Sequence, residues 1–181
     1  LKVPSMGLQY KSVMDSLLQA NDKLLRKTPN LIIDIRGSGG GSDYVWMGLM
    51  PYLNTSRVRR PILEFRCTAF TAEGMREYLN SNTDIDDNIK LIREKYIELM
   101  LASDGKFSDF VGDKEQTNIT VESKILVLPQ RVAIMYNENN GSADEGFLMW
   151  ARQSYKVKTY GVNSYGVFDV SNLERAKSPY T

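Results

Sequence analysis

Short apolar runs alternate along this chain with segments whose apolar residues recur at helical spacing. Between residues 7 and 27 the apolar side chains return every three to four positions, which predicts an amphipathic helix ending before Pro29. The next run, residues 31–35, is continuous and β-branched, as is typical of a buried parallel strand. A further helix is expected from Ser42 or Asp43 to about Leu53, because either residue can cap it.

The later part of the chain repeats this alternation. A helix is expected after Ser142, and five more apolar runs predict strands: 62–66, 125–128, 132–136, 157–160 and 167–170. Strands that alternate with helices indicate an α/β domain with a largely parallel sheet. A length of 181 residues fits one domain of this kind, so we expect a single domain over residues 1–181.

Residues 71–123 differ in character from the rest of the chain. Residues 84–103 read as an amphipathic helix, whose apolar face we assign to Ile85, Ile89, Ile92, Tyr96 and Leu99. Residues 103–123 are polar and irregular. We therefore predict a helical insertion at about 71–123.

Composition and charge exclude several classes of function. The net charge is +1 and the only basic cluster is at residues 57–60, so we expect no nucleic-acid partner. One cysteine and no histidine leave no conventional zinc site. No apolar run approaches the roughly 20 residues of a membrane span. Because the chain begins at Leu1 and ends without an obvious stop at Thr181, we expect both ends to be truncated.

The first motif that suggests chemistry is the glycine-rich run at residues 34–42. A dinucleotide or Walker loop would need glycine where Ser42 stands, and a Walker loop would need lysine where Asp43 stands. Phosphate binding is therefore disfavoured. Glycines leave the backbone unshielded, so the N–H groups of Gly39 and Gly40 are candidates for stabilising an oxyanion. The alternative is that the glycines only form a tight turn between a strand and a helix.

The second motif is Ser142, which follows the predicted strand 132–136 and opens a helix. With Glu145 three residues later it fits the capping-box pattern, in which the hydroxyl would only cap the helix. A serine on a sharp strand-to-helix turn is also the arrangement of a nucleophile elbow, in which the Ala143 N–H would donate to the oxyanion. Both interpretations remain open on the tetrapeptide alone.

Together these motifs resemble the C-terminal processing peptidases and tricorn-type serine peptidases. Residues 31–41 resemble that family's strand and oxyanion loop, and residues 132–147, with Asn137, Ser142, Ala143 and Glu145, resemble its nucleophile segment. Residues 160–166 resemble its next strand and turn. The similarity covers residues 31–170 apart from the insertion. It implies an α/β fold with a Clp protease/crotonase-like core, in which a largely parallel sheet is flanked by helices.

The resemblance also implies a function and a site. Ser142 would be the nucleophile of a serine endopeptidase, and the N–H groups of Gly39, Gly40 and Ala143 would form its oxyanion hole. Such a site needs no metal or organic cofactor, and its partner is a peptide or protein substrate. The resemblance suggests an extracytoplasmic location in a bacterium.

The general base is missing from the motif. Residues 160–166 form the third motif of the resemblance. The Ser/Lys branch of the family has a lysine directly after the last glycine of this motif, where this chain has Val167 after Gly166. The tricorn-like branch uses a histidine from upstream of the glycine loop, and the chain contains none. We therefore expect the tricorn-like branch, with a base supplied from outside this segment and little activity in the segment alone.

Two alternatives remain. One is a catalytically degenerate member that binds peptides or other ligands without cleaving them. The other is a crotonase-like acyl-CoA enzyme, which would share the oxyanion loop but would not need Ser142.

Overall fold

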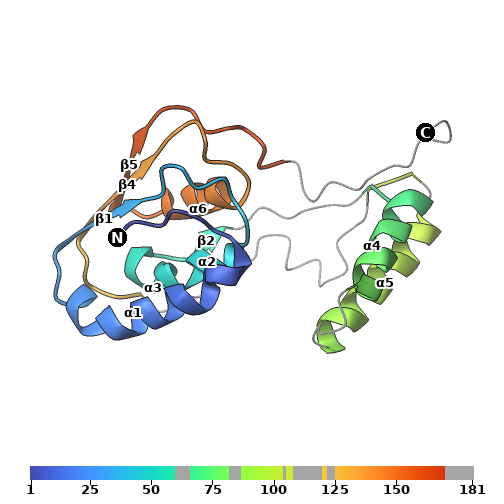
Figure 1. Cartoon of the computed structure of the whole chain (residues 1–181), viewed down its shortest axis with the longest axis horizontal. Coiled ribbons are helices and arrows are strands. Elements are labelled where there is room, and N and C mark those ends of the chain that lie inside the picture. The colour runs from blue at the N-terminus through green and yellow to red at the C-terminus, as the bar shows by residue number, and fades with distance from the viewer. Residues whose placement is uncertain (60–65, 82–86, 104, 108–119, 122–124, 170–181) are drawn as a thin grey trace. The chain divides into compact units, whose positions relative to one another are not determined.

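The computed structural model describes residues 1–59, 66–81, 87–103, 105–107, 120–121 and 125–169 (Figure 1). It divides into two compact units. The first comprises Leu1–Arg60 and Thr120–Ser171, and the second comprises Pro61–Ile119 and Asn172–Thr181. The first unit contains both sequence motifs.

A three-stranded parallel sheet forms the centre of the first unit. Its strand order is β1 (Asn30–Asp34), β4 (Arg131–Tyr136), β5 (Val157–Gly161). Leu31 pairs with Val132, and Val132 pairs in turn with Val157. Because all three strands run in the same direction, the loops that follow them leave from one edge of the sheet. This edge therefore gathers the glycine-rich loop, the Ser142 turn and the segment after β5.

The helices of the first unit are short except for the first. The segment before β1 forms η1 (Leu8–Tyr10) and α1 (Lys11–Leu25), which confirms the expected amphipathic helix. The helix expected at residues 42–53 is present as three consecutive pieces, and one more helix follows Ser142. These elements are α2 (Asp43–Trp46), η2 (Met47–Leu49), α3 (Met50–Leu53) and α6 (Ala143–Ala151). A separate two-stranded antiparallel pair joins β2 (Val58–Arg59) to β3 (Thr120–Val121).

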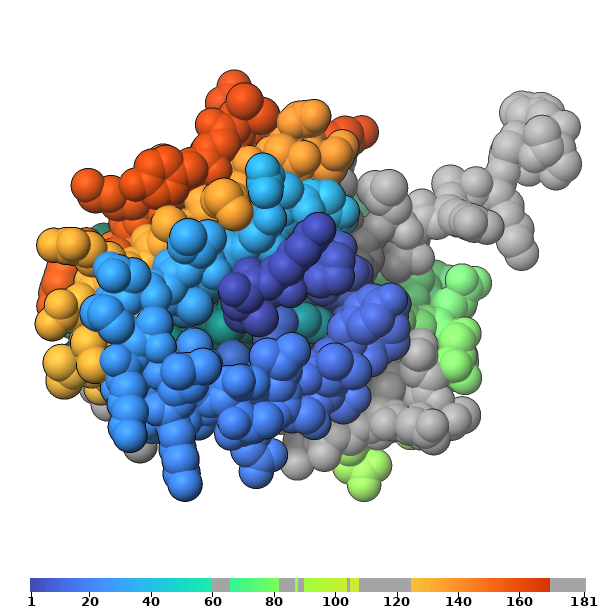
Figure 2. All heavy atoms as spheres, turned by 60° about the vertical axis from the view of Figure 1, so that its left-hand side comes forward, coloured from blue at the N-terminus to red at the C-terminus, as the bar shows by residue number. Residues whose placement is uncertain are grey.

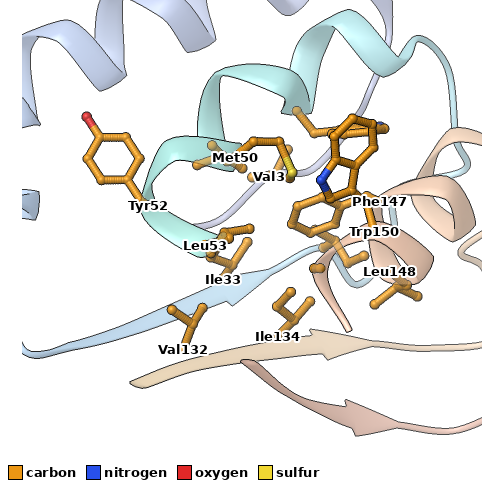
Figure 3. Close-up of a cluster of buried hydrophobic side chains, with 14 of the residues drawn as sticks. Val3, Ile33, Met50, Tyr52, Leu53, Val132, Ile134, Phe147, Leu148 and Trp150 are labelled. Atoms are coloured by element: carbon orange, nitrogen blue, oxygen red, sulfur yellow. The ribbon is translucent and has the colours of Figure 1, made fainter. Parts of the chain in front are cut away.

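The hydrophobic core lies between one face of the sheet and these helices. In Figure 3, Ile33, Val132 and Ile134 point from the strands toward side chains of α3 and α6. Trp46 of α2 packs edge-on against Trp150 of α6, with ring centroids 5.3 Å apart. Ile32, on the opposite face of β1, is 56% exposed. The continuous apolar run at residues 31–35 is therefore a strand, but only one of its faces is covered by described residues.

The amino-terminal segment extends the sheet beyond β1. Val3 N–H donates to Asp34 O at 2.8 Å, and Ser42 N–H donates to Met6 O at 2.7 Å. In the space-filling view this dark-blue segment lies beside lighter-blue residues of the β1 region (Figure 2). Gly41 has φ +140°, and a Cβ there would lie 2.2 Å from Met6 O. Glycine is thus required at residue 41 because another backbone passes too closely for any side chain.

The second unit is built around a pair of helices. α4 (Ala69–Ser81) packs against α5 (Asp87–Ala102) around a small core of Cys67, Ala72, Met75, Ile97 and Met100. The expected helix at 84–103 is thus confirmed for its described part, whereas α4 was not predicted. The expected apolar face was partly wrong, since Ile92 is 47% exposed while Ile97 and Met100 are buried.

Two predicted strands are not present as such. Residues 125–128 form no strand, and residues 167–169 end in a turn. The run at 62–66 lies outside the described residues except for Arg66, which forms an isolated bridge with Phe107. No helix in the described part of the chain is long and apolar enough to cross a membrane.

Candidate active site

The glycine-rich loop and the Ser142 turn lie in direct contact at the carboxyl edge of the sheet. A Cβ placed on Gly40 would lie 2.5 Å from Gly141 O and 3.1 Å from Ser142 Cβ. A hydrogen bond also joins the starts of the two turns: Gly37 N–H donates to Asn137 Oδ1 at 3.3 Å. The parallel sheet therefore brings together two motifs that are about a hundred residues apart in the sequence.

Ser142 has an unusual backbone conformation, with φ 54° and ψ −115°. It is the one non-glycine residue with a positive φ among those that the structure describes. This region of backbone space strains any residue with a Cβ, at a typical cost of about 1–3 kcal/mol. The residue itself is exposed. A sharp turn of this kind presents a side chain at the end of a sheet, as a nucleophile elbow does.

The Ser142 turn has the arrangement of a capping box, in which the Ser142 side chain faces the backbone of Glu145 and the Glu145 side chain accepts from Ser142 N–H. The carbonyl oxygen of Ser142 also accepts from Glu145 N–H at 2.9 Å and from Gly146 N–H at 3.0 Å. The first turn of α6 is therefore satisfied mainly by backbone oxygen. Because backbone oxygen already accepts from these N–H groups, the helix start does not depend on the Ser142 hydroxyl.

Glu145 joins the Ser142 turn to the segment that follows β5. Its buried carboxylate accepts hydrogen bonds from Ser142 N–H at 2.9 Å and Val167 N–H at 3.0 Å. It also accepts from Ser164 Oγ at 2.6 Å and from Gly166 N–H at 2.8 Å. Burial alone would raise the pKa of Glu145, but these four donors outweigh it and hold the pKa below its ordinary value of 4.5.

Glu145→Gln is expected to destabilise the fold by about 2 kcal/mol near neutral pH, because the amide replaces an acceptor oxygen with a donor that faces other donors. A lowered carboxyl pKa contributes stability above the unfolded pKa and loses it as the pH falls through the folded pKa. The difference between wild type and variant should therefore shrink below pH 4.5. Urea unfolding at a series of pH values measures it. A constant difference down to acid pH would contradict this role of the carboxylate.

A second buried polar network joins the Ser142 turn to the glycine-rich loop. Asp144, Asn140 and Ser38 are all fully buried. Asp144 Oδ1 accepts from Ser38 Oγ at 2.8 Å, and Asp144 Oδ2 accepts from Asn140 Nδ2 at 2.9 Å. Asn140 Nδ2 also donates to Ile35 O at 2.7 Å. Burial raises the pKa of Asp144, although its hydrogen bonds act in the opposite direction.

The three predicted oxyanion donors have different environments. Gly40 N–H donates to Asp144 Oδ2 at 3.0 Å, so it is already occupied. Gly39 is exposed, and a Cβ there would meet no atom within 4 Å. Within the described part of the chain, the N–H groups of Gly39 and Ala143 make no hydrogen bond. Two of the three donors are therefore unpaired, one on the exposed Gly39 and one on the buried Ala143.

Sequence reasoning missed Asp144. Its only signal was an acidic residue in the first turn of a helix, four positions after Asn140, which is also what favourable helix electrostatics would give. Its hydrogen bonds to residues 38 and 40 depend on tertiary structure.

The lysines near the third motif do not reach Ser142. Lys156 is buried and donates through Nζ to Leu126 O, and burial lowers its pKa. It precedes Val157, which pairs with Val132 at the start of β4, whereas Ser142 follows the end of β4. At the rise of a strand, the length of β4 alone is ~16 Å. Neither Lys156 nor its near neighbour Lys158 is therefore placed to act as a base for Ser142.

Residue 167, where the Ser/Lys branch has its lysine, lies beside the Ser142 turn. Val167 Cγ2 would be 2.9 Å from a Cβ on Gly141. The position is thus close to the nucleophile candidate but carries an apolar side chain. Among the described residues, no three His, Cys, Asp or Glu side chains gather where they could hold a metal ion.

The strain at Ser142 leads to a stability prediction. In urea unfolding, Ser142→Gly should have a free energy of unfolding about 1 kcal/mol higher than Ser142→Ala. Both variants lack the hydroxyl, but only glycine relieves the strain of the positive φ. The same pair of substitutions at the exposed Ser16, inside α1, should give the opposite order by about 1 kcal/mol. Equal stability of the two variants at residue 142 would argue against the strained turn.

Comparison with known proteins gives one matching family and several similar solved structures. The model of peptidase family S41 matches residues 1–178. Among solved structures, mature CPAF is similar with a TM-score of 0.59 and 15% identity, over 92% of this chain and 37% of that one. Mature CPAF complexed with lactacystin gives a TM-score of 0.56 and 15% identity, over 92% of this chain and 38% of that one.

At this level of identity the structural likeness shows the fold alone, which is a mixed α/β fold consistent with S41 peptidases. The chain spans less than two-fifths of the length of these CPAF chains. Among curated proteins, none matches this sequence.

Proposed function

The chain belongs to peptidase family S41, and we propose that it forms the catalytic core of a serine endopeptidase in which Ser142 is the nucleophile. The observation that carries this proposal is the strained, exposed turn at Ser142, in contact with the glycine-rich loop. A capping serine does not need a positive φ, whereas a nucleophile that must project from the end of a sheet often has one.

The geometry supports a division of roles in acyl transfer. Ser142 Oγ would attack the peptide carbonyl as a base removes its proton, and the developing oxyanion would accept from the open N–H groups of Gly39 and Ala143. The amine would leave with a proton returned by the base, and water would then release the acyl group. Gly40 N–H, which the sequence also predicted as a donor, is held by Asp144 and is left out of this scheme.

The base in this proposal comes from outside the segment. The chain has no histidine, and Val167 occupies the position of the Ser/Lys lysine. We therefore retain the tricorn-like arrangement, with an upstream histidine as base, an extended peptide or protein as substrate and an extracytoplasmic bacterial location suggested by the resemblance.

Hydrolysis of an unstructured protein by the full-length protein tests this function. Fluorescently labelled casein should be cleaved by the wild type, and a serine-directed fluorophosphonate should block the cleavage. Equal cleavage by wild type and Ser142→Ala would refute the proposal.

The second candidate function is binding without cleavage, and the apolar Val167 beside the serine turn favours it. Two results together would support it: no histidine in the sequence upstream of the glycine loop, and saturable peptide binding without product in fluorescence anisotropy. An upstream histidine and measurable turnover would instead support the peptidase.

A further inference from the structure

A fully buried polar cluster connects the two halves of the candidate site. It consists of Ser38 from the glycine-rich loop and Asn140 and Asp144 from the Ser142 turn and α6; we call it the Asp144 cluster. Its hydrogen bonds are of two kinds. Ser38 is bonded to Asp144 and to Asn140, each more than a hundred residues away, and Asn140 is bonded to Asp144, four residues later. The proposed mechanism uses none of these side chains directly.

The cluster anchors the glycine-rich loop through several hydrogen bonds. Asp144 accepts from Ser38 Oγ and from Gly40 N–H, and Asn140 Nδ2 donates to Ser38 O at 3.2 Å. Gly40 is itself buried with φ +88°, packed against the backbone of Gly141. Gly39, between the two anchored residues, is exposed and its N–H is open. The loop is thus anchored on both sides of Gly39.

We propose that Asp144 is a positioning residue of the oxyanion loop: by capturing the Gly40 N–H and the Ser38 hydroxyl it fixes the loop with the Gly39 N–H available to the oxyanion. This inference rests on the proposed function. It also divides the glycine amides by role, with Gly40 anchoring the loop and Gly39 and Ala143 serving the reaction.

The chemistry of the cluster explains why an acceptor with two oxygens suits residue 144. The donors that meet the carboxylate are the Ser38 hydroxyl and the N–H groups of Gly40, Gly141 and Asn140, all of them neutral. Buried donors left without an acceptor are unfavourable, so loss of the carboxylate would release the loop from this arrangement. An asparagine could keep the contacts with the glycine-rich loop and Asn140, with its oxygen accepting from Gly40 and Asn140 and its amide donating to a reoriented Ser38 hydroxyl. Alanine could keep none.

Asp144→Ala and Asp144→Asn in the full-length protein test this inference. Asp144→Ala should lower kcat by roughly 10- to 100-fold with KM changed by less than about threefold, because the loop stabilises the transition state more than it binds the substrate. Asp144→Asn should recover kcat to within about threefold of wild type. Ser38→Ala should give a smaller loss that adds nothing to Asp144→Ala, since both remove the same anchor.

Hydrogen–deuterium exchange provides a readout that does not depend on catalysis. Peptides covering residues 37–41 should exchange about tenfold faster or more in Asp144→Ala and at the wild-type rate in Asp144→Asn, while peptides from α1 stay unchanged in both. Unchanged exchange in Asp144→Ala, or a loss of kcat in Asp144→Asn as large as in Asp144→Ala, would overturn the positioning role. If the wild type hydrolyses nothing, the proposed function fails and the catalytic half of this inference fails with it, whereas the exchange rates still decide whether Asp144 anchors the loop.

Discussion

Replacement of Ser142 by alanine is expected to lower kcat for peptide hydrolysis by the full-length protein by roughly 10⁴-fold or more. The substitution removes the only atom that would form the acyl bond, and no other hydroxyl lies on the same strained turn. KM should change little, because the open N–H groups of Gly39 and Ala143 and the surrounding surface remain. Initial rates across a range of peptide concentrations separate the two constants.

Ser16→Ala is the matched control for this experiment. Ser16 is an exposed serine on α1, and the loss of its hydroxyl leaves the site untouched. It should retain wild-type kcat and KM. A Ser142→Ala protein that is folded and still cleaves within about tenfold of wild type would mean that another group is the nucleophile.

Gly40→Ala is expected to have the second largest effect, a loss of kcat of roughly 10²-fold or more. The new Cβ would lie 2.5 Å from Gly141 O, a distance that no relaxed structure tolerates, and φ at this residue is +88°. Either the glycine-rich loop or the Ser142 turn must then move, and oxyanion donors are effective only when they are aimed in advance. Steady-state kinetics and the urea midpoint should both change.

Gly37→Ala separates backbone strain from the collision. Gly37 has a similar φ of +84°, but a Cβ there would meet no atom within 4 Å. Its stability loss should be of the order of 1 kcal/mol, the usual cost of a positive φ for alanine, with kcat within about tenfold of wild type. If Gly37→Ala and Gly40→Ala lost activity equally, the contact between the two turns would not be what matters.

The elements that position the site were predictable from the sequence for a physical reason. The runs at 31–35, 132–136 and 157–160 are rich in β-branched or apolar residues, and each is followed by a polar or glycine-rich turn. Consecutive strand–helix units produce parallel strands, and parallel strands deliver their following loops to one edge. The contact between the glycine-rich loop and Ser142 follows from this rule.

Other features depended on neighbours that no local pattern reveals. Residues 125–128 are as apolar as the true strands, yet Ile125 and Val127 are 52% and 82% exposed and the segment pairs with none of the described strands. A strand needs a partner, and β-propensity does not supply one. On α5 the buried side chains are those that face α4, so the helical period alone placed Ile92 on the wrong face.

The oxyanion donors show the same limit at the site itself. Three consecutive glycines are equivalent in the sequence, and nothing local distinguishes Gly39 from Gly40. The difference arises from Asp144, 104 residues later in the chain, which accepts the Gly40 N–H. Long-range hydrogen bonds of this kind can be found only once the sheet has brought the two turns together.

The most direct test of the account is to locate the covalent adduct that a fluorophosphonate forms with the full-length protein. Intact-mass measurement should show one adduct per chain, and peptide mapping should place it on Ser142. The Ser142→Ala variant should remain unmodified under the same conditions, while Ser16→Ala should be labelled like the wild type. An adduct on a different residue, or labelling that persists in Ser142→Ala, would contradict the assignment of Ser142 as the nucleophile.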